Sequence, residues 1–276
     1  MATKKEFYNY ISSSSTPSVS LGDYVTSPAT AFLKFANDAK DAAYMCNNKF
    51  KKNQNGQYRK DSLDSIHIIN AGLLSSIMGN YETFQKYLFA QMFEYSIYLN
   101  KFKVQPFLKM LEHAGTGIDI ELAKMAAYRD NPVGIGVMLA YNLKGWQTPS
   151  TVVKYFEAFC LKDATGKRPA IYSDENKKDL AILWQMRHSI VHTAGTITIP
   201  DSQKINDLNK FGEQEILLAP EFIPAVSRKL HKLVNRATTT MGNAFQLNLR
   251  TDLSIEVRNK IQKLFKVESS NRGWLI

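Results

Sequence analysis

Apolar residues recur along the chain at the spacing of α-helices rather than in the alternation typical of β-strands. Leucine, methionine and aromatic residues keep helical spacing through 66–102, with a weak break at Gly79. Ser27, followed by Pro28 and an alanine-rich stretch, is a typical helix start. Further helices are expected over about 104–114, 119–128, 150–159, 175–192, 224–241 and 255–265. The pattern predicts a mainly α fold with minor extended segments.

Polar and small residues mark the connections between these helices. The first two dozen residues, rich in serine, threonine and proline, are expected to form a flexible lead-in. Residues 46–62 indicate a polar, basic loop with a turn at Asn55-Gly56. A loop around a short apolar piece is expected over 131–150, and an extended or loop segment over 197–205.

The net charge of +10 lies at the two ends of the chain. Residues 1–60 carry nine Lys/Arg against four Asp/Glu, residues 221–276 carry ten against four, and the stretch between them is nearly neutral. Basic flanks around a neutral body fit a protein that meets nucleic acid, and a solubilising surface charge fits equally well. We therefore expect a basic segment with one helix (1–61), a helical domain (62–240) and a basic helix and tail (241–276).

Two clusters of basic residues are candidates for contact with phosphate groups. One lies in the predicted loop, and the other lies at helical spacing in the helix expected over 224–241. They are Lys49, Lys51, Lys52, Arg59 and Lys60 in the loop, and Arg228, Lys229, Lys232 and Arg236 in the helix. Equally well, either cluster is simply a solvent-exposed surface that binds no phosphate.

Length and composition favour one large globular unit, because 276 residues suffice for a hydrophobic core. The two cysteines, Cys46 and Cys160, lie in apolar, helix-like stretches, and we expect buried free thiols of a reducing compartment, with a single disulfide as the alternative. No apolar run reaches the roughly 18–20 residues that span a bilayer. The first residues also lack the apolar segment of a signal peptide. These features predict a soluble, cytoplasmic protein without a membrane partner.

Three polar residues stand close together at the end of an otherwise apolar helical stretch, 179–197. They are Arg187, His188 and His192. The His-x3-His spacing also suits a zinc pair on a helix, but Ser189 stands where a metalloprotease helix has glutamate, and no third ligand cluster is visible. We therefore predict no metal and no cofactor.

This stretch carries a family resemblance. Arg187 to His192, followed by Thr-Ala-Gly, resembles the Arg-polar-x3-His motif of the HEPN superfamily, small helical domains of RNA-cleaving toxins, phage-defence effectors and CRISPR-associated ribonucleases. The family usually has asparagine after the arginine, where this chain has His188. Residues 79–97 resemble the long first helix of these domains, with Glu82 at the acidic position, and 145–159 is similar to a segment before the motif helix in one stand-alone subgroup. The resemblance covers about 62–240.

The resemblance implies a HEPN-like helical bundle with additional N-terminal and C-terminal helices. It further implies a metal-independent endoribonuclease that acts on tRNA or mRNA as a toxin or an abortive-infection, antiphage effector. Two protomers of such proteins commonly pair, so a homodimer with a composite active site is expected. An antitoxin or a sensor protein that activates the enzyme is implied as a further partner.

The residue types suit RNA cleavage. A base that takes the proton of the 2′-OH lets this oxygen attack the adjacent phosphorus, and a histidine can do so at neutral pH. We assign His192 as general acid and base, Arg187 as the clamp on the phosphate, and His188 as an orienting or assisting group. On an ideal helix, Arg187 and His192 diverge by about 140°. Both can face one substrate only if the helix loosens near His192, which the following Thr-Ala-Gly allows.

Other interpretations of the same residues remain open. The fold can retain the motif and serve as a non-catalytic module that binds RNA, a nucleotide or a partner protein. Alternatively, the two histidines are ordinary core or surface residues, and Arg187 is a structural partner of Glu82 or Asp179.

Overall fold

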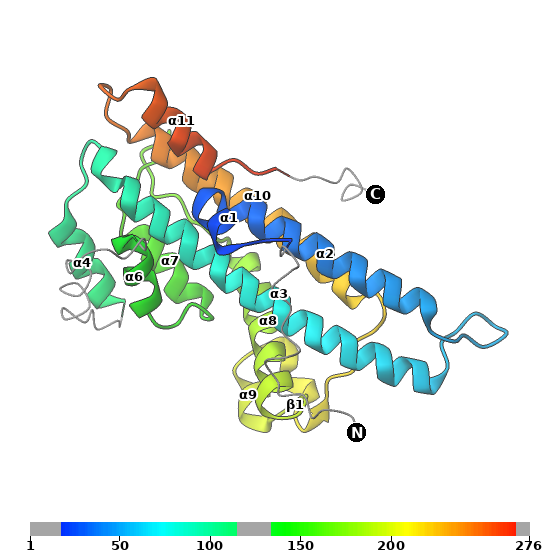
Figure 1. The fold of residues 1–276 in the computed structure, drawn as a ribbon. Helices are drawn as coiled ribbons and strands as arrows, with labels where there is room; N and C mark the ends of the chain where they lie inside the picture. Colours follow the sequence, from blue (N-terminus) through cyan, green and yellow to red (C-terminus); the bar gives the residue numbers. More distant parts are fainter. Residues whose placement is uncertain (1–17, 115–133, 269–276) are drawn as a thin grey trace, which may run out of the picture.

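Helices dominate the computed structural model, which describes residues 18–114 and 134–268 (Figure 1). The α-helices are α1 (Leu21–Thr26), α2 (Pro28–Lys49), α3 (Lys60–Tyr95), α4 (Val104–His113), α6 (Ile135–Asn142), α7 (Pro149–Glu157), α8 (Asp174–His192), α9 (Ile199–Gln203), α10 (Phe222–Leu247) and α11 (Ile255–Leu264). Two 3-10 helices, η2 (Ser96–Tyr98) and η3 (Asn206–Phe211), and two strands, β1 (Thr196–Ile197) and β2 (Gln214–Glu215), complete the described elements. The prediction of a mainly α fold is confirmed.

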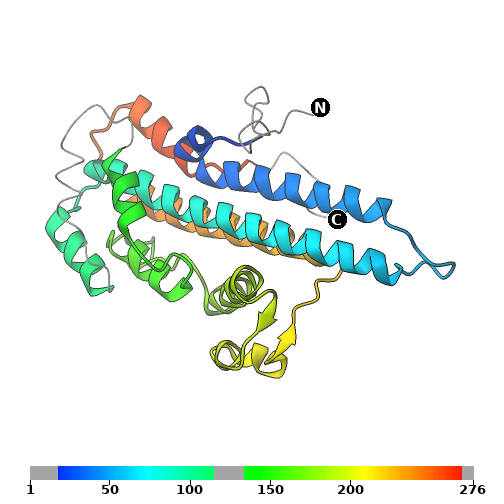
Figure 2. The same ribbon diagram turned by 60° about the horizontal axis from the view of Figure 1, so that its bottom comes forward.

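The helix α3 is the centre of the molecule. It has 36 residues and is therefore about 54 Å long. The helices α2 and α10 run alongside it, and α6 and α8 pack on its remaining side (Figures 1 and 2). Six consecutive residues of α3, 87–92, are all buried, so this part of the helix is covered on every side. Gly136 of α6 makes one of these contacts possible, because a Cβ atom there would lie 2.3 Å from the Ala90 carbonyl oxygen.

A single core joins the three segments that the charge pattern suggested. The boundary at 61/62 falls in the first turn of α3, and the boundary at 240/241 falls inside α10. Phe32 of α2 and Phe245 of α10 are fully buried in the same hydrophobic cluster as α3. The described parts of 1–61 and 241–276 therefore cover α3 rather than form separate units.

The first and last described segments meet at the start of α2. The Ser27 and Thr30 hydroxyls donate hydrogen bonds to the Lys266 carbonyl oxygen, at 3.0 and 3.2 Å. The Glu268 N–H in turn donates to the Thr30 hydroxyl at 3.1 Å. These bonds hold the segment after α11 against the junction of α1 and α2.

Several elements differ from the sequence-based expectation. The helix α3 passes through Gly79 without a break, because burial outweighs the roughly 1 kcal/mol that glycine costs in a helix. The helix α1 forms within the expected lead-in, where Ser20 and Asp23 make a reciprocal capping box. An apolar helix, α6, occupies part of the loop expected over 131–150. The helix expected over 119–128 lies outside the described residues.

Both cysteines are free thiols, as expected, but the prediction that they are buried is wrong. Cys46 is half-buried in the last turn of α2, and Cys160 is exposed just after α7. Each lies near the end of its helix, where the apolar stretch leaves the core. Among the described residues, no helix is both long enough and apolar enough to cross a bilayer.

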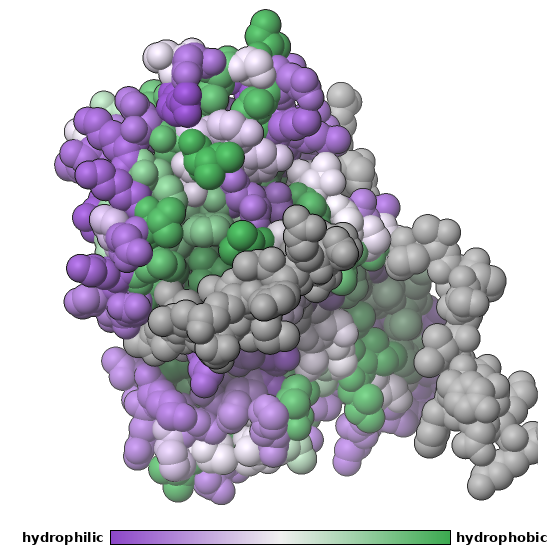
Figure 3. Space-filling model, turned by 60° about the vertical axis from the view of Figure 1, so that its left-hand side comes forward, coloured by the Kyte–Doolittle hydropathy of each residue, from purple (hydrophilic) through white to green (hydrophobic). Residues whose placement is uncertain are grey.

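The end of the molecule formed by α4, α6 and η2 mixes apolar and polar surface (Figure 3). Ile97, Val104 and Ile135 remain 68%, 49% and 53% exposed there. In the view of Figure 3, hydrophobic patches lie among hydrophilic surface.

We predict that Phe89→Ala destabilises the fold as strongly as a single core substitution can. Phe89 is fully buried, and its ring lies within 6.2 Å, centroid to centroid, of the rings of Phe107, Trp146, Tyr155, Phe156 and Phe159. The cavity should lower the free energy of unfolding by about 3–5 kcal/mol in urea denaturation. Tyr44→Ala, at a position 64% exposed, is the control and should change it by less than about 0.5 kcal/mol. Equal effects of the two substitutions would contradict the burial described here.

Candidate functional site

The motif helix α8 is anchored at its first turn. Ser173 caps it by accepting a hydrogen bond from the Asn176 N–H at 3.3 Å. The preceding residue, Tyr172, is buried, and its hydroxyl accepts hydrogen bonds from the Tyr81 hydroxyl at 2.8 Å and from the Gln85 amide at 2.9 Å. Burial raises the pKa of Tyr172 to about 12. The central helix α3 therefore fixes the position where α8 begins.

Arg187 continues the buried stripe of α8. Leu180, Leu183 and Trp184 face the core, and Arg187 follows Trp184 at the i+3 position of the same stripe. Its guanidinium carbon lies 5.5 Å from the centre of the Trp184 ring, which gives a cation–π contact. The side chain is half-buried, and its Nε atom is buried without a hydrogen-bond partner in the described part of the chain. Within that part Arg187 also forms no ion pair, so its positive charge is not neutralised.

His188 and His192 lie together on the outer face of α8. Both side chains are exposed, and their ring centres are 4.8 Å apart. They stand one turn apart, as i and i+4 positions do on a helix. Over 18–114 and 134–268, no hydrogen bond or ion pair engages either imidazole, although the charge of His188 acts on nearby Asp201. The structure thus brings the two histidines together and places Arg187 on the neighbouring, core-facing side.

The helix does not loosen before His192, contrary to the expectation from the sequence. α8 stays regular through His192 and ends at Thr193. The Ser189 carbonyl oxygen accepts three hydrogen bonds there, from the Thr193 N–H at 3.0 Å, the Thr193 hydroxyl at 3.0 Å and the Gly195 N–H at 2.9 Å. The positive φ angles of Ala194 (52°) and Gly195 (84°) turn the chain away only after the motif. Arg187 and His192 therefore keep the divergence of about 140° that a regular helix imposes.

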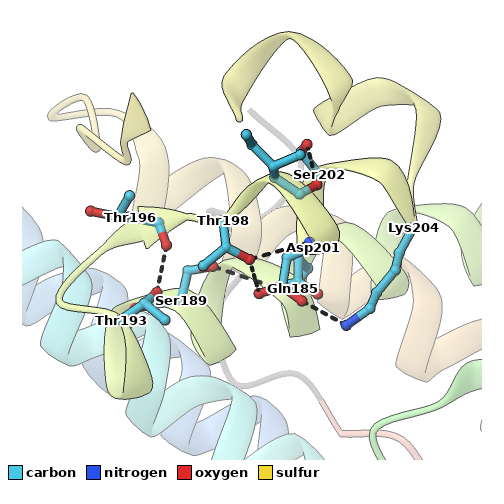
Figure 4. A network of polar contacts seen from close by, with 9 residues as sticks. Gln185, Ser189, Thr193, Thr196, Thr198, Asp201, Ser202 and Lys204 are labelled. Atoms are coloured by element: carbon cyan, nitrogen blue, oxygen red, sulfur yellow. Dashed lines mark hydrogen bonds and ion pairs between the residues drawn. The ribbon is translucent and has the colours of Figure 1, made fainter. Parts of the chain in front are cut away.

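The end of α8 is held by a small lobe that consists of β1, α9, η3 and β2 (Figure 4). β1 pairs antiparallel with β2, Thr196 opposite Glu215, and the Ile216 N–H donates to the Gly195 carbonyl oxygen at 2.8 Å. The Thr193 hydroxyl also reaches the Thr196 carbonyl oxygen. Inside α8, the Gln185 amide donates to the Ser189 hydroxyl at 3.4 Å. Hydrogen bonds thus link the end of the motif helix to the strand that follows it.

Asp201 is the buried acidic residue of this lobe. Its carboxylate pairs with the Lys204 ammonium at 2.6 Å and accepts a hydrogen bond from the Thr198 hydroxyl at 2.9 Å. The hydrogen bond from Lys204 lowers the pKa of the Asp201 carboxyl most, and the Thr198 hydrogen bond and the charges of Lys204 and His188 act in the same direction against desolvation. The carboxylate of Asp201 therefore lies within electrostatic reach of His188.

Asp201 is not among the site residues predicted from the sequence, although the sequence holds a signal for it. The segment 197–205 was expected to be extended or loop, but β1 continues into the short helix α9 after one residue. Thr198, with Pro200 and Asp201 just after it, follows the pattern of a helix N-terminus, and the Thr198 hydroxyl does accept a hydrogen bond from the Asp201 N–H.

Glu82 does not join the motif in the described chain. Its carboxylate pairs with the Lys86 ammonium at 2.7 Å and accepts a hydrogen bond from the Gln147 amide at 3.2 Å. Asp179, the other carboxylate considered as a partner of Arg187, pairs with Lys229 instead. The interpretation of Arg187 as a structural partner of Glu82 or Asp179 is therefore wrong.

The basic loop projects from the end of the bundle at which α2 meets α3 (Figure 1). Its five basic residues are all exposed, and a Lys52–Tyr58 bridge closes the loop around the Asn55-Gly56 turn. Lys52 lies 4.6 Å from the centre of the Tyr58 ring, and Arg59 pairs with Asp61 at 3.6 Å. The predicted turn is present, and the loop presents its charge to solvent.

The helical basic cluster divides into two parts. Arg228, Lys232 and Arg236 are exposed at i, i+4 and i+8 along α10, so they form one outward row. Lys229 faces α8 instead and pairs with Glu175 at 3.2 Å and with Asp179. These carboxylates raise the pKa of Lys229 and neutralise its charge. Lys229 therefore links α10 to α8, and we no longer regard it as a candidate for phosphate binding.

The described residues hold no group of three or more histidine, cysteine, aspartate or glutamate side chains arranged to bind a metal. A cavity of about 790 Å³ lies between α1, α2 and α11, and includes Lys34, Lys263 and Lys266 in its lining, but none of the motif residues. The motif is therefore a surface site.

No protein-family model, curated protein or solved structure matches the chain. The assignment of the motif accordingly rests on its residues and on the geometry described above.

We predict that Gly195→Ala lowers the free energy of unfolding by about 1–2 kcal/mol, because alanine resists the left-handed conformation that holds the end of α8. The matched control is Gly72→Ala, at an exposed helical position where the added methyl group meets no atom within 4 Å. That change should stabilise the protein by up to about 1 kcal/mol. Urea denaturation measures both, and a loss of stability in the control variant as well would contradict the explanation from φ.

The Asp201 carboxylate should stabilise the fold in a pH-dependent way. Its pKa is lowered in the folded state, so the stabilisation is present above about pH 4, the unfolded value, and is lost as the pH falls through the folded value. We expect Asp201→Asn to lower the free energy of unfolding by about 1 kcal/mol at pH 7 and by much less at pH 3. Asp64→Asn, at an exposed aspartate, should show no such dependence in parallel urea titrations. A constant difference between wild type and Asp201→Asn across this range would refute the argument.

Proposed function

We propose that the protein is a metal-independent endoribonuclease of the HEPN type. The observation that carries the proposal is the pair of exposed imidazoles of His188 and His192, one helical turn apart on the helix that also carries Arg187. Within the described residues, neither imidazole has a hydrogen bond and the Arg187 guanidinium has no ion pair. Cleavage of RNA through its own 2′-OH needs a base, an acid and a cation for the phosphate, and these three residues supply those groups.

In this mechanism, His192 accepts the proton of the 2′-OH, whose oxygen forms a bond to the adjacent phosphorus. The bond from phosphorus to the 5′-oxygen breaks, and protonated His188 assists by supplying the proton that the leaving oxygen needs. The ring separation of 4.8 Å lets both histidines reach one phosphodiester. The products are a 2′,3′-cyclic phosphate and a 5′-hydroxyl, and Arg187 offsets the charge that builds up on the phosphate oxygens.

The direction of Arg187 favours a composite site in a homodimer. On the regular helix, Arg187 points about 140° away from His192, so one chain does not direct both side chains at the same phosphate. A second copy of the chain can supply the cation that faces the histidine pair. Val191 is 52% exposed and lies one helical turn after both Arg187 (i+4) and His188 (i+3). An apolar side chain at this place suits contact with a second protomer.

The exposed basic residues provide paths for the rest of the RNA. The loop over 49–60 and the row of Arg228, Lys232 and Arg236 form no ion pair in the described chain, except for Arg59 with Asp61. Because such contacts release counterions, RNA affinity should depend steeply on salt. We place the protein in the cytoplasm, acting on tRNA or mRNA as a toxin or an antiphage effector, with an antitoxin or sensor protein that controls it.

A second candidate function is a non-catalytic module that binds RNA, a nucleotide or a protein partner. The regular end of α8 favours it, because one chain alone does not bring Arg187 and His192 to the same point. The two functions differ in what substitution of His192 does: it removes cleavage from an enzyme, whereas a binding module has no cleavage to lose.

The test is incubation of the purified protein with total tRNA and a labelled single-stranded RNA in excess EDTA. We expect cleavage with cyclic-phosphate ends by the wild type, and a loss of at least about 100-fold in rate for His192→Ala. The matched control is His113→Ala, at an exposed histidine of α4. RNA binding by His192→Ala should persist in a filter assay.

The outcomes separate the two functions. Cleavage that survives in His192→Ala, or that stops in EDTA, would overturn the proposed mechanism. RNA binding without cleavage by the wild type, also after mixing with lysate to supply an activator, would favour the non-catalytic module.

A further inference from the structure

The two exposed histidines of α8 have ring nitrogens without a partner among the described residues, as the ligands of a metal site need. Of the five histidines in the chain, His67 accepts a hydrogen bond from the Leu218 N–H at 3.0 Å, and His113 lies 2.6 Å from the Lys109 carbonyl oxygen. The rings of His188 and His192 have no such bond within 18–114 and 134–268. Their nitrogens are therefore available to an ion from solvent.

The spacing of the rings fits two imidazoles bound to one ion. A metal–nitrogen distance of about 2.1 Å, with about 1.1 Å more from the nitrogen to the ring centre, places each ring centre about 3.2 Å from the ion. At angles of about 90–110° between the two ligands, the ring centres are then about 4.5–5.2 Å apart. The observed separation of 4.8 Å lies within this range.

The supporting helix end holds this spacing. The Ser189 carbonyl oxygen, which accepts three hydrogen bonds, lies between the two histidines in sequence and keeps the last turn of α8 regular. The helix backbone that carries both histidines is therefore fixed before an ion arrives.

In contrast to the expectation of no metal from the sequence, we propose that His188 and His192 chelate one divalent transition-metal ion of the class that prefers imidazole, such as Ni²⁺ or Zn²⁺. The described chain offers no third ligand, so water fills the remaining coordination positions. Such a site differs from a structural or catalytic zinc centre, which has three or four protein ligands. A bound ion occupies the nitrogens that the proposed cleavage uses, so ion binding and cleavage exclude each other.

The test uses the untagged, full-length protein and titration with Ni²⁺ by isothermal calorimetry at pH 7.5. We expect one ion per chain for the wild type. Removal of either histidine leaves a single ligand, so His188→Ala and His192→Ala should each weaken binding by at least about tenfold, because the second imidazole acts at a high effective concentration. The control His113→Ala should bind like the wild type, and circular dichroism without metal should show that all variants fold alike.

The stoichiometry distinguishes a chelate from separate weak sites. Binding of one ion by each histidine independently would halve the stoichiometry in the single variants without a change in affinity, and that result would overturn the proposal. Binding that neither substitution affects would overturn it as well. The measurement requires no ribonuclease activity, so the metal site and the proposed function can fail separately.

Discussion

A helix that is apolar on several faces at once is not stable alone in water, because only neighbouring helices can cover all of those faces. This constraint on α3 explains the arrangement of the other long elements. The helices α2 and α10 cover two sides, and α6 and α8 cover the rest (Figure 2). The six consecutive buried residues at 87–92 leave no open side in that region.

The same helix also determines where the candidate site lies. Tyr81 and Gln85 of α3 hold the Tyr172 hydroxyl just before α8 begins, and Trp184 packs near Tyr81 with ring centres 6.5 Å apart. Since Arg187 stacks on Trp184, a chain of contacts runs from the middle of α3 to the motif. The histidines project from an exposed face of a helix that the core has already oriented.

The sequence predicted the helical class and most helices, because hydrophobic periodicity follows from burial on one face. At Gly79 a weak break was expected, but packing overrides local propensity and α3 continues. Over 131–150 a loop was expected, but α6 forms there, where Gly136 packs closely against α3. In the site, the adjacency of His188 and His192 follows from their spacing. The neutralisation of Lys229 by Glu175 and Asp179 did not, because it depends on how α10 crosses α8.

The hydrogen bonds from Ser27 and Thr30 to the Lys266 carbonyl oxygen join residues more than 230 positions apart. The helix α2 also meets α10 across a long separation, since the Ser227 hydroxyl donates to the Ala36 carbonyl oxygen at 3.3 Å. A chain that leaves the ribosome therefore exposes an uncovered side of α2 and α3 until α10 has been synthesised. Contacts between residues this far apart in sequence form slowly, so we expect the fold to be completed late, with that apolar side open to aggregation until then.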